Sequence, residues 1–224
     1  MKTKYIRLLF LVFSFIVLSG ESKAQSCKTI WSLSYFGDND FFHMPSDIEV
    51  DKARSLIYIT DSGNNRIVVF DFQGQFKKSF GSLGQGPGEF NRPTGLFIFE
   101  NGCLAVADYE NLRIQLFDQN NAFIETINTV NVRVADLIFT DNKYYTVSTY
   151  GASGYRLNQS EEKFQPLVTI LDKEGKLTGE ISVDDYPDTH PFIRAIKNRV
   201  CLTLSPDKKL FLPYFAINKI QIFD

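Results

Sequence analysis

The chain repeats one pattern of strand, tight turn and strand, and this repetition is the strongest constraint on its fold. The first copy, residues 56–71, reads LIYITDSGNNRIVVFD, and related copies occupy residues 104–118 and 210–224. β-Branched and aromatic residues on both sides of each turn favour extended strands. Asp61, Gly63 and Asn65 supply the side-chain hydrogen bonds and backbone freedom that a tight turn requires. Each copy is therefore predicted to be a β-hairpin.

Each hairpin lies between two further predicted strands. In the first three units the preceding strand covers residues 45–51, 93–98 and 134–139, and the following strand covers residues 75–80, 122–127 and 176–183. The hairpin of the third unit is the least regular and pairs residues 143–148 with 166–172. The hairpins end at Asp71, Asp118, Asp172 and Asp224, roughly 50 residues apart, which is a spacing typical of four-stranded repeats.

Stacking of the repeats explains how such short sheets bury both faces. A single four-stranded sheet cannot do so, whereas sheets arranged radially around one axis cover one another. Glycine, proline and asparagine interrupt the chain at the intervals of short strands, and the apolar spacing is not that of helices. The sequence predicts an all-β fold, a β-propeller of four-stranded antiparallel blades, with a single β-sandwich as the alternative. The predicted blades cover about 44–81, 92–128, 134–183 and 198–224, with 28–37 as a possible closing strand.

Several motifs resemble those of NHL repeats. They are DSGNNRI at residues 61–67, Phe70-Asp71, Gly74, Phe76, Phe80-Gly81 and Pro93-Thr94-Gly95. The loop GQGPGEF at residues 84–90 resembles a signature of the six-bladed β-propeller proteins that Bacteroidota export. The first two units match well, the other two match at their strand ends, and the resemblance covers residues 28–224.

This resemblance implies a ring of six blades and a binding or scaffold role. The chain shows about four blades, so two alternatives are open. We favour a truncated copy of a larger propeller. The other alternative is a four-bladed ring that residues 28–37 close.

The N-terminus predicts export. Basic residues precede an apolar run at residues 8–18, which is too short for an ordinary membrane span. The small residues Ser22 and Ala24 predict cleavage after Ala24, so residues 1–24 are expected to be a signal peptide and the mature chain to be periplasmic or associated with the cell envelope. An uncleaved anchor and a lipid anchor at Cys27 are less favoured alternatives.

Charge and cysteine content exclude two further classes. The formal net charge is −2, which is not the basic footprint of a nucleic-acid-binding protein. The chain has three cysteines, and Cys103 and Cys201 fall in different repeats, so no disulfide framework is expected. Both are predicted to be buried small apolar side chains.

Cations at equivalent repeat positions give the candidate binding site. Arg92, Arg133 and Lys197 each stand just before a strand that is predicted to line the channel, where the first unit has Met44. The loops that lead into such strands converge on one mouth of a propeller, so cations there would attract an anionic group. Solvated surface charge is the alternative. The candidate binding residues are His43, Arg92, Arg133 and Arg194.

Other charged or glycine-rich segments are interpreted as structural. Asp61 precedes Arg66 by the same interval that separates Asp108 from Arg113, which favours an acid that caps the turn and an arginine that pairs with it. The glycine loop at 81–88 lacks the spacing of a phosphate-binding motif and is predicted to be a tight turn between blades. The acidic segment SVDDYPDTHP at 182–191 matches no cation-binding loop.

These observations predict an exported, non-enzymatic binding or scaffold protein that presents loops to a protein, peptide or glycan partner. No catalytic residue, metal or cofactor and no nucleic-acid partner is expected. The alternative is a metal-dependent hydrolase or lyase with its site at the channel mouth, as in some NHL-type propellers. Such a site needs several converging ligands, whereas His43 and His190 are the two histidines of the chain and are not at equivalent positions.

Overall fold

The computed structural model describes residues 32, 35–38, 40–129, 132–148, 168–181 and 202, and the backbone alone of 203–204, 210–214 and 219–223. The chain divides into two compact units, Met1–Ser32 and Leu33–Asp224, and every element below lies in the second. The predicted signal peptide and most of the predicted closing strand lie outside the described residues. Within the part of the chain that is described, no helix is both long and apolar enough to cross a membrane.

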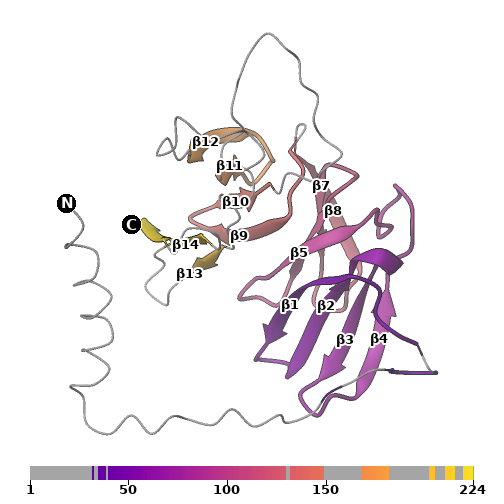
Figure 1. Ribbon diagram of the computed structural model, residues 1–224. Coiled ribbons are helices and arrows are strands. Elements are labelled where there is room, and N and C mark those ends of the chain that lie inside the picture. The colour runs from indigo at the N-terminus through magenta and orange to yellow at the C-terminus, as the bar shows by residue number, and fades with distance from the viewer. Residues whose placement is uncertain are drawn as a thin grey trace, which may run out of the picture. The chain divides into compact units, whose positions relative to one another are not determined.

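The described secondary structure is almost entirely strand (Figure 1). The first sheet contains β1 (Pro45–Asp51), β2 (Leu56–Asp61), β3 (Arg66–Asp71) and β4 (Phe76–Phe80), with a 3-10 turn η1 (Ser62–Asn64) between β2 and β3. The second contains β5 (Pro93–Ile98), β6 (Leu104–Asp108), β7 (Arg113–Phe117) and β8 (Phe123–Asn128). The third contains β9 (Asp136–Thr140), β10 (Lys143–Val147), β11 (Val168–Asp172) and β12 (Leu177–Ile181), and the fourth contains β13 (Thr203–Leu204), β14 (Leu210–Tyr214) and β15 (Lys219–Phe223).

Each sheet is a simple antiparallel meander in which neighbours in the sequence are neighbours in space. The predicted four-stranded units are therefore confirmed for the first three repeats, with strand ends shifted by a few residues at most. The β2–β3 and β6–β7 turns lie at the same edge of their sheets as the starts of β1 and β5, because Pro45 pairs with Asp61 and Pro93 with Asp108. We call this edge the upper face, and the loops that lead into β1, β5 and β9 the incoming loops.

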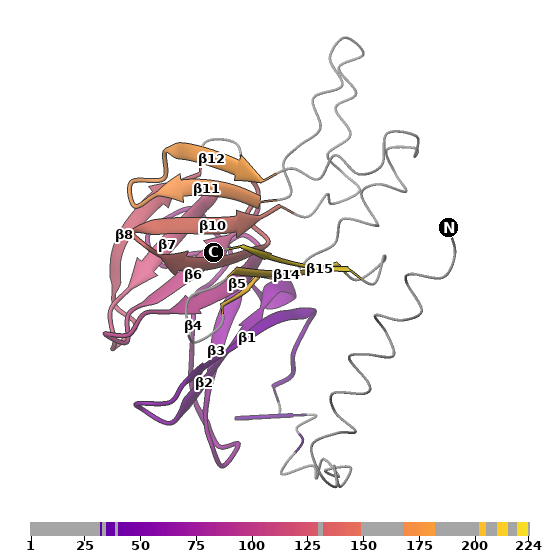
Figure 2. The ribbon, with the colours of Figure 1, turned by 90° about the vertical axis from the view of Figure 1, so that its left-hand side faces the viewer.

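Consecutive sheets bury apolar side chains against each other. Tyr58, Ile67 and Val69 of the first sheet pack in one cluster with Leu96 and Val106 of the second and with Phe90 of the loop between the two sheets. The second and third sheets share another cluster, in which Ala105, Ile114 and Ile127 meet Leu137, Tyr144 and Leu171. Figure 2 shows the first three sheets following one another along the colour gradient. Serial packing of this kind differs from a two-sheet sandwich and supports the predicted stacking of repeats.

The other side of the first sheet is covered by phenylalanines from the incoming loop before β1. Phe36 and Phe42 of this loop pack on Phe70 and Phe76, with ring centroids 5.4–6.0 Å apart. Aromatic contacts at these separations add to the stabilisation from apolar burial. This loop is thereby fixed to the sheet before β1 begins.

The first strands of the first and third sheets are joined to the following repeat by side-chain to backbone hydrogen bonds. Asp47 on β1 accepts the amide of Leu96 at 2.7 Å, and Asp136 on β9 accepts the amide of Leu202 at 2.9 Å. β5 has Gly95 at the equivalent position, and there a Cβ atom would lie 2.9 Å from the Cα atom of Asp136. The second and third sheets thus approach too closely for any side chain at residue 95.

One turn type explains the recurrent aspartate at the end of the first three hairpins. Asp71, Asp118 and Asp172 each accept two backbone amides from the following turn through one carboxylate oxygen. The third residue of these turns has a positive φ and is Gly74, Asn121 or Gly175. Asn121 differs because both polar atoms of its side chain are buried with no hydrogen-bond partner.

Cys103 differs from its prediction. It stands in the turn between β5 and β6, where the backbone comes to the surface, so its side chain is half-buried rather than buried. It is a free cysteine. Cys201 lies outside the described residues.

Replacing Asn121 by glycine is expected to stabilise the protein by about 1 kcal/mol, because it removes unpaired buried polar atoms and the cost of a positive φ. Urea denaturation of Asn121→Gly and the parent protein measures the difference. The reciprocal control is Gly175→Asn, which should destabilise because a Cβ atom there would lie 2.5 Å from the carbonyl oxygen of Asn128. A loss of stability in Asn121→Gly would contradict this interpretation.

Candidate functional site

A buried aspartate organises the upper face in each of the first two sheets. Asp61 and Asp108 are fully buried at the ends of β2 and β6. One oxygen of Asp61 accepts the amide of His43 at 2.6 Å, and the other accepts Asn64 at 2.9 Å and the Nε atom of Arg66 at 2.8 Å. The carboxylate therefore joins the hairpin turn to the incoming loop. The predicted structural role of the Asp61–Arg66 pair is confirmed by this geometry.

The second sheet repeats the same set of contacts. Asp108 accepts the amide of Asn91 at 2.7 Å through one oxygen, and Asn111 at 2.8 Å and Arg113 at 2.7 Å through the other. Aspartate, asparagine and arginine thus occupy the first, fourth and sixth positions of both turns. A buried ion pair with additional hydrogen bonds satisfies the charges that burial would otherwise penalise.

Arg113 also fixes the glycine-rich loop. Its guanidinium donates to the carbonyl oxygens of Gln85 at 2.6 Å, Gly86 at 3.0 Å and Glu89 at 2.9 Å. The side chain of Glu89 folds back and accepts the amide of Gly86 at 2.8 Å. The loop connects β4 with β5, as the sequence predicted, and its carbonyl oxygens point at a protein cation rather than leaving amides free for a phosphate.

Three of the four predicted binding residues lie on these loops. The backbone of His43 is held by Asp61 and Gly63, and its ring lies against Gly63, where a Cβ atom would be 2.5 Å from Nδ1. Arg92 follows the glycine-rich loop and has a positive φ of 61° directly before Pro93. Arg133 stands in the next incoming loop, before β9. Arg194 lies outside the described residues, as do Lys197 and the acidic segment 182–191.

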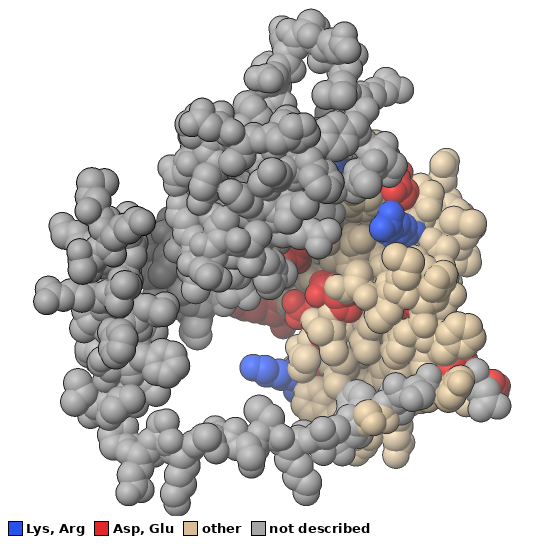
Figure 3. All heavy atoms as spheres, in the orientation of Figure 1, with Lys and Arg blue, Asp and Glu red and all other residues tan. Residues whose placement is uncertain are grey.

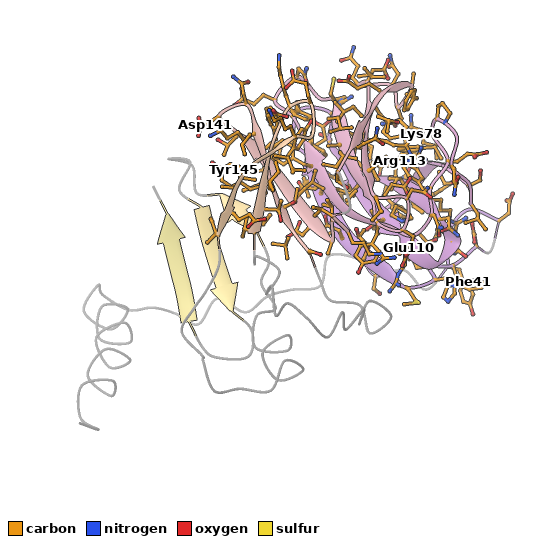
Figure 4. All side chains as sticks on the ribbon, turned by 90° about the horizontal axis from the view of Figure 1, so that it is seen from above. Phe41, Lys78, Glu110, Arg113, Asp141 and Tyr145 are labelled. Carbon is orange, nitrogen blue, oxygen red and sulfur yellow. The ribbon has the colours of Figure 1, made fainter. Side chains whose placement is uncertain are left out.

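Arg92 and Arg133 converge on the β6–β7 turn, whereas His43 stays on the first sheet. Glu110 of this turn faces both guanidiniums, with oxygen–nitrogen distances of 3.7 Å to Arg92 and 3.2 Å to Arg133. The ring of Tyr109 lies under both, with its centroid 5.6 and 5.9 Å from the two Cζ atoms. In Figure 4, Glu110 and Phe41 lie on one side of the view, away from Asp141 in the β9–β10 turn.

The predicted convergence of cations is thus seen for two arginines, and the sequence analysis missed their partners. Glu110 and Tyr109 stand in the second hairpin turn, which was interpreted only through Asp108 and Arg113. Their positions in a turn at the same edge as the incoming loops could have indicated that they face Arg92. The position of Glu110 in this turn is the feature of the sequence that could have indicated a charged cluster instead of separate solvated charges.

Carboxylates on the first strands of the sheets were also missed. Burial, together with the nearby Asp47 carboxylate, raises the pKa of Glu49 to about 7. Burial likewise raises the pKa of Asp136 to about 6 and also raises that of Asp47. Acidic side chains gather in the middle of the view in Figure 3, where β1 and β5 run in Figure 1. The first strands therefore carry half-buried carboxylates, which the prediction of a cationic mouth did not include.

Comparison with known families identifies this architecture. Residues 38–224 match the family described as 6-bladed β-propeller, and the chain belongs to this family. The fold and the resemblance to NHL repeats that the sequence indicated are confirmed.

Curated relatives contain NHL repeats or belong to larger enzymes. The chain is 32% identical over 136 residues to NHL repeat-containing protein 2 of Gallus gallus, covering 56% of this chain and 18% of that protein. It is 35% identical over 86 residues to peptidylglycine α-amidating monooxygenase of Rattus norvegicus, covering 36% of this chain and 9% of that enzyme. The chain therefore spans less than a fifth of the length of either relative.

Solved structures share the fold at low identity. A protein of Bacteroides fragilis whose name proposes that it is exported aligns with a TM-score of 0.57 and 13% identity, covering 84% of this chain and 52% of that one. The catalytically inactive H270A virginiamycin B lyase of Staphylococcus aureus with quinupristin aligns with a TM-score of 0.55 and 14% identity, covering 86% and 55%. Both span about twice the length that this chain covers.

Replacing Arg113 by methionine is expected to lower the free energy of unfolding by about 3–5 kcal/mol, because it leaves Asp108 buried and unpaired. Arg66→Met should cost less, since Arg66 donates to fewer loop carbonyl groups. Urea denaturation of the variants measures both. Arg92→Met is the control and should change stability by less than about 0.5 kcal/mol because its side chain is half exposed. A loss for Arg113→Met no larger than that of the control would contradict the role of this pair.

The contribution of Glu49 to the stability of the protein should fall as the pH rises from about 4.5 to about 7. Over this range Glu49 is protonated in the folded chain and ionised in the unfolded chain, so each increase in pH favours unfolding; above it the contribution is constant. Glu49→Gln should raise stability at pH 8 by at least about 1 kcal/mol and reduce the pH dependence. Thermal denaturation between about pH 5 and pH 8 measures this, with Glu125→Gln, an exposed residue on β8, as control. Equal pH profiles for the parent and Glu49→Gln proteins would contradict the assignment.

Proposed function

We propose that this chain is an exported, non-enzymatic binding module that uses the upper face to hold a peptide or glycan segment of its partner. The observation that carries this proposal is the pair of buried aspartates, which hold the incoming loops and hairpin turns rigidly. A rigid face loses little conformational entropy when it binds, so its exposed side chains can contribute to affinity.

The exposed side chains of this face are of the types that interfaces use. Phe41 and Met44 stand in the incoming loop before β1 with exposed fractions of 57% and 59%. Arg92 and Arg133 are 49% and 45% exposed at the side chain. Aromatic residues, methionine and arginine are enriched in binding interfaces, and lysine and glutamate are depleted. The mixture supports a binding role for the upper face.

The test compares two double variants with the same loss of charge. Arg92→Ala with Arg133→Ala changes the upper face, whereas Lys52→Ala with Lys173→Ala changes exposed lysines in the β1–β2 and β11–β12 turns at the opposite edge. Immobilised peptide and glycan libraries are probed with the parent and both variants. Binding that is lost by more than about tenfold in the arginine variant alone supports the proposal. Equal binding by all three proteins and by a Phe41→Ala variant, or none by the parent, would refute it.

Two readouts on the same preparation address export and the enzymatic alternative. The intact mass of protein recovered from the periplasm should correspond to a chain that begins at Gln25, and a chain that retains Met1 would contradict cleavage.

Elemental analysis tests the alternative of a metal-dependent lyase or hydrolase. Among the described residues, no group of three histidine, cysteine or acidic side chains could hold a metal ion. A stoichiometric metal in the purified protein would favour the enzyme.

A further inference from the structure

Two arginines from different incoming loops share one carboxylate on the upper face. Arg92 precedes β5 and Arg133 precedes β9, yet both face Glu110 of the β6–β7 turn. Arg133 donates its Nε–H to Glu110 over 3.3 Å. The 3.7 Å separation from Arg92 is too long for a hydrogen bond. Glu110 therefore partly compensates two positive charges and does not saturate the donors of either guanidinium.

Tyr109 holds the guanidiniums in position. Its side chain is 95% buried, and its ring is within 6 Å of both Cζ atoms. Contact of an arginine with an aromatic ring is favourable and restricts the motion of the guanidinium. Both arginines nevertheless remain about half exposed, so solvent and ligands reach them. The cluster is thus positioned before any ligand arrives.

We propose that Arg92 and Arg133 bind a carboxylate of a peptide partner, and that Glu110 occupies this position until the partner displaces it. This inference rests on the proposed function of the upper face and specifies the chemistry that it recognises. Arginine binds carboxylates through paired N–H donors, which the long contact to Glu110 leaves available on Arg92. When the carboxylate of a ligand enters, Glu110 turns outward from its hairpin turn into solvent.

Exposed apolar side chains in the loops of the same upper face favour a peptide over a sugar acid. Phe41 and Met44 are exposed in the incoming loop before β1, and Leu83 is 67% exposed in the loop before β5. The carbonyl group of Phe41 accepts Arg66 and Asn64, and the neighbouring Gly84 carbonyl accepts Asn111, so these loops are fixed beside the two hairpin turns. A peptide with an acidic residue between large apolar residues complements this arrangement.

Because Glu110 competes with the ligand, its substitution should have an effect on affinity opposite to that of an ordinary contact residue. A ligand carboxylate that binds the same arginines must displace Glu110, and the negative charge of Glu110 repels the ligand. Glu110→Gln removes both effects, so it should tighten binding, whereas loss of a residue that contacts the ligand weakens it. The expected gain is roughly two- to fivefold, the range of one partly exposed charge pair.

Three peptide probes distinguish the sources of the carboxylate. The first is a pentapeptide with a central glutamate between leucine and phenylalanine residues, acetylated and amidated at its ends. The second has glutamine at the centre, and the third is the glutamine peptide with a free terminal carboxylate. Fluorescence anisotropy with the full protein should show binding of the first or third probe and at least tenfold weaker binding of the second. An oligogalacturonide is the sugar-acid comparison.

The variants decide the proposal. Glu110→Gln should tighten binding of the carboxylate probe, Arg92→Ala with Arg133→Ala should weaken it at least tenfold, and Glu125→Gln, the control on β8, should leave it unchanged. Unchanged or weaker binding by a folded Glu110→Gln protein would overturn the exchange. Binding of the oligogalacturonide but of no peptide would overturn the peptide assignment.

The outcomes also separate this inference from the proposed function. If all three peptides bind equally and binding depends on Phe41 but not on the arginines, the upper face is a binding site and the carboxylate receptor is wrong. If no peptide binds and the library screen is negative, both are wrong. Circular dichroism of each variant establishes that it is folded.

Discussion

The rest of the upper face depends on one interaction, a carboxylate buried at the end of the second strand of a sheet. Asp61 and Asp108 each bind an amide of the incoming loop, an asparagine of the turn and an arginine that starts the next strand. A buried carboxylate without these partners would be strongly destabilising, so the charge forces the loop, turn and strand to assemble together. The loops are consequently part of the folded framework rather than flexible connections.

A second constraint acts where the first strands run side by side. These strands are linked by carboxylates and hydroxyl groups to backbone groups of the next sheet: Asp47 binds Leu96, Thr94 binds the carbonyl of Val134, and Asp136 binds Leu202. Apolar packing further out fills the space between the sheets. The inner links are polar and directional, so they set the offset between sheets that the apolar clusters alone leave free.

The acidic inner strands and the arginines of the upper face lie on different parts of the same repeats. Carboxylates with raised pKa values, such as Glu49, carry less negative charge near neutral pH than their number implies. The arginines retain their charge at every physiological pH. The loops of the upper face therefore carry fixed positive groups, whereas the first strands carry titratable acids.

Strand positions and the hairpin motif could be predicted from the sequence because they are local. The alternation of apolar residues places β1 to β12 within a few residues, and the equal spacing of Asp61 to Arg66 and Asp108 to Arg113 indicated their pairing. The meeting of Arg92 and Arg133 also followed from repeat alignment. The role of Glu110 as their common partner could not be predicted, because this contact depends on how far the β6–β7 turn projects toward the two incoming loops.

The partial burial of Glu49 and Asp136 could not be predicted from the sequence for a related reason. An acidic residue in a strand next to apolar residues is ordinarily assigned to a solvent-facing position. Here Glu49 and Asp136 are half-buried and Asp136 accepts the amide of Leu202, and nothing in the local pattern of β1 or β9 reports such surroundings. The one indication was that Asp47 and Asp136 occupy equivalent positions in their repeats.

Gly95 restricts the order in which the first three sheets can follow one another. The first and third sheets carry aspartate at this position and reach across to a neighbour, but the second carries no side chain and is approached by the backbone of the third. A copy of the first sheet placed second would collide with the third, and a copy of the second placed first would leave the Leu96 position without its acceptor. The repeats share one pattern but are not interchangeable, because exchanging the first and second sheets would create this clash and remove this hydrogen bond.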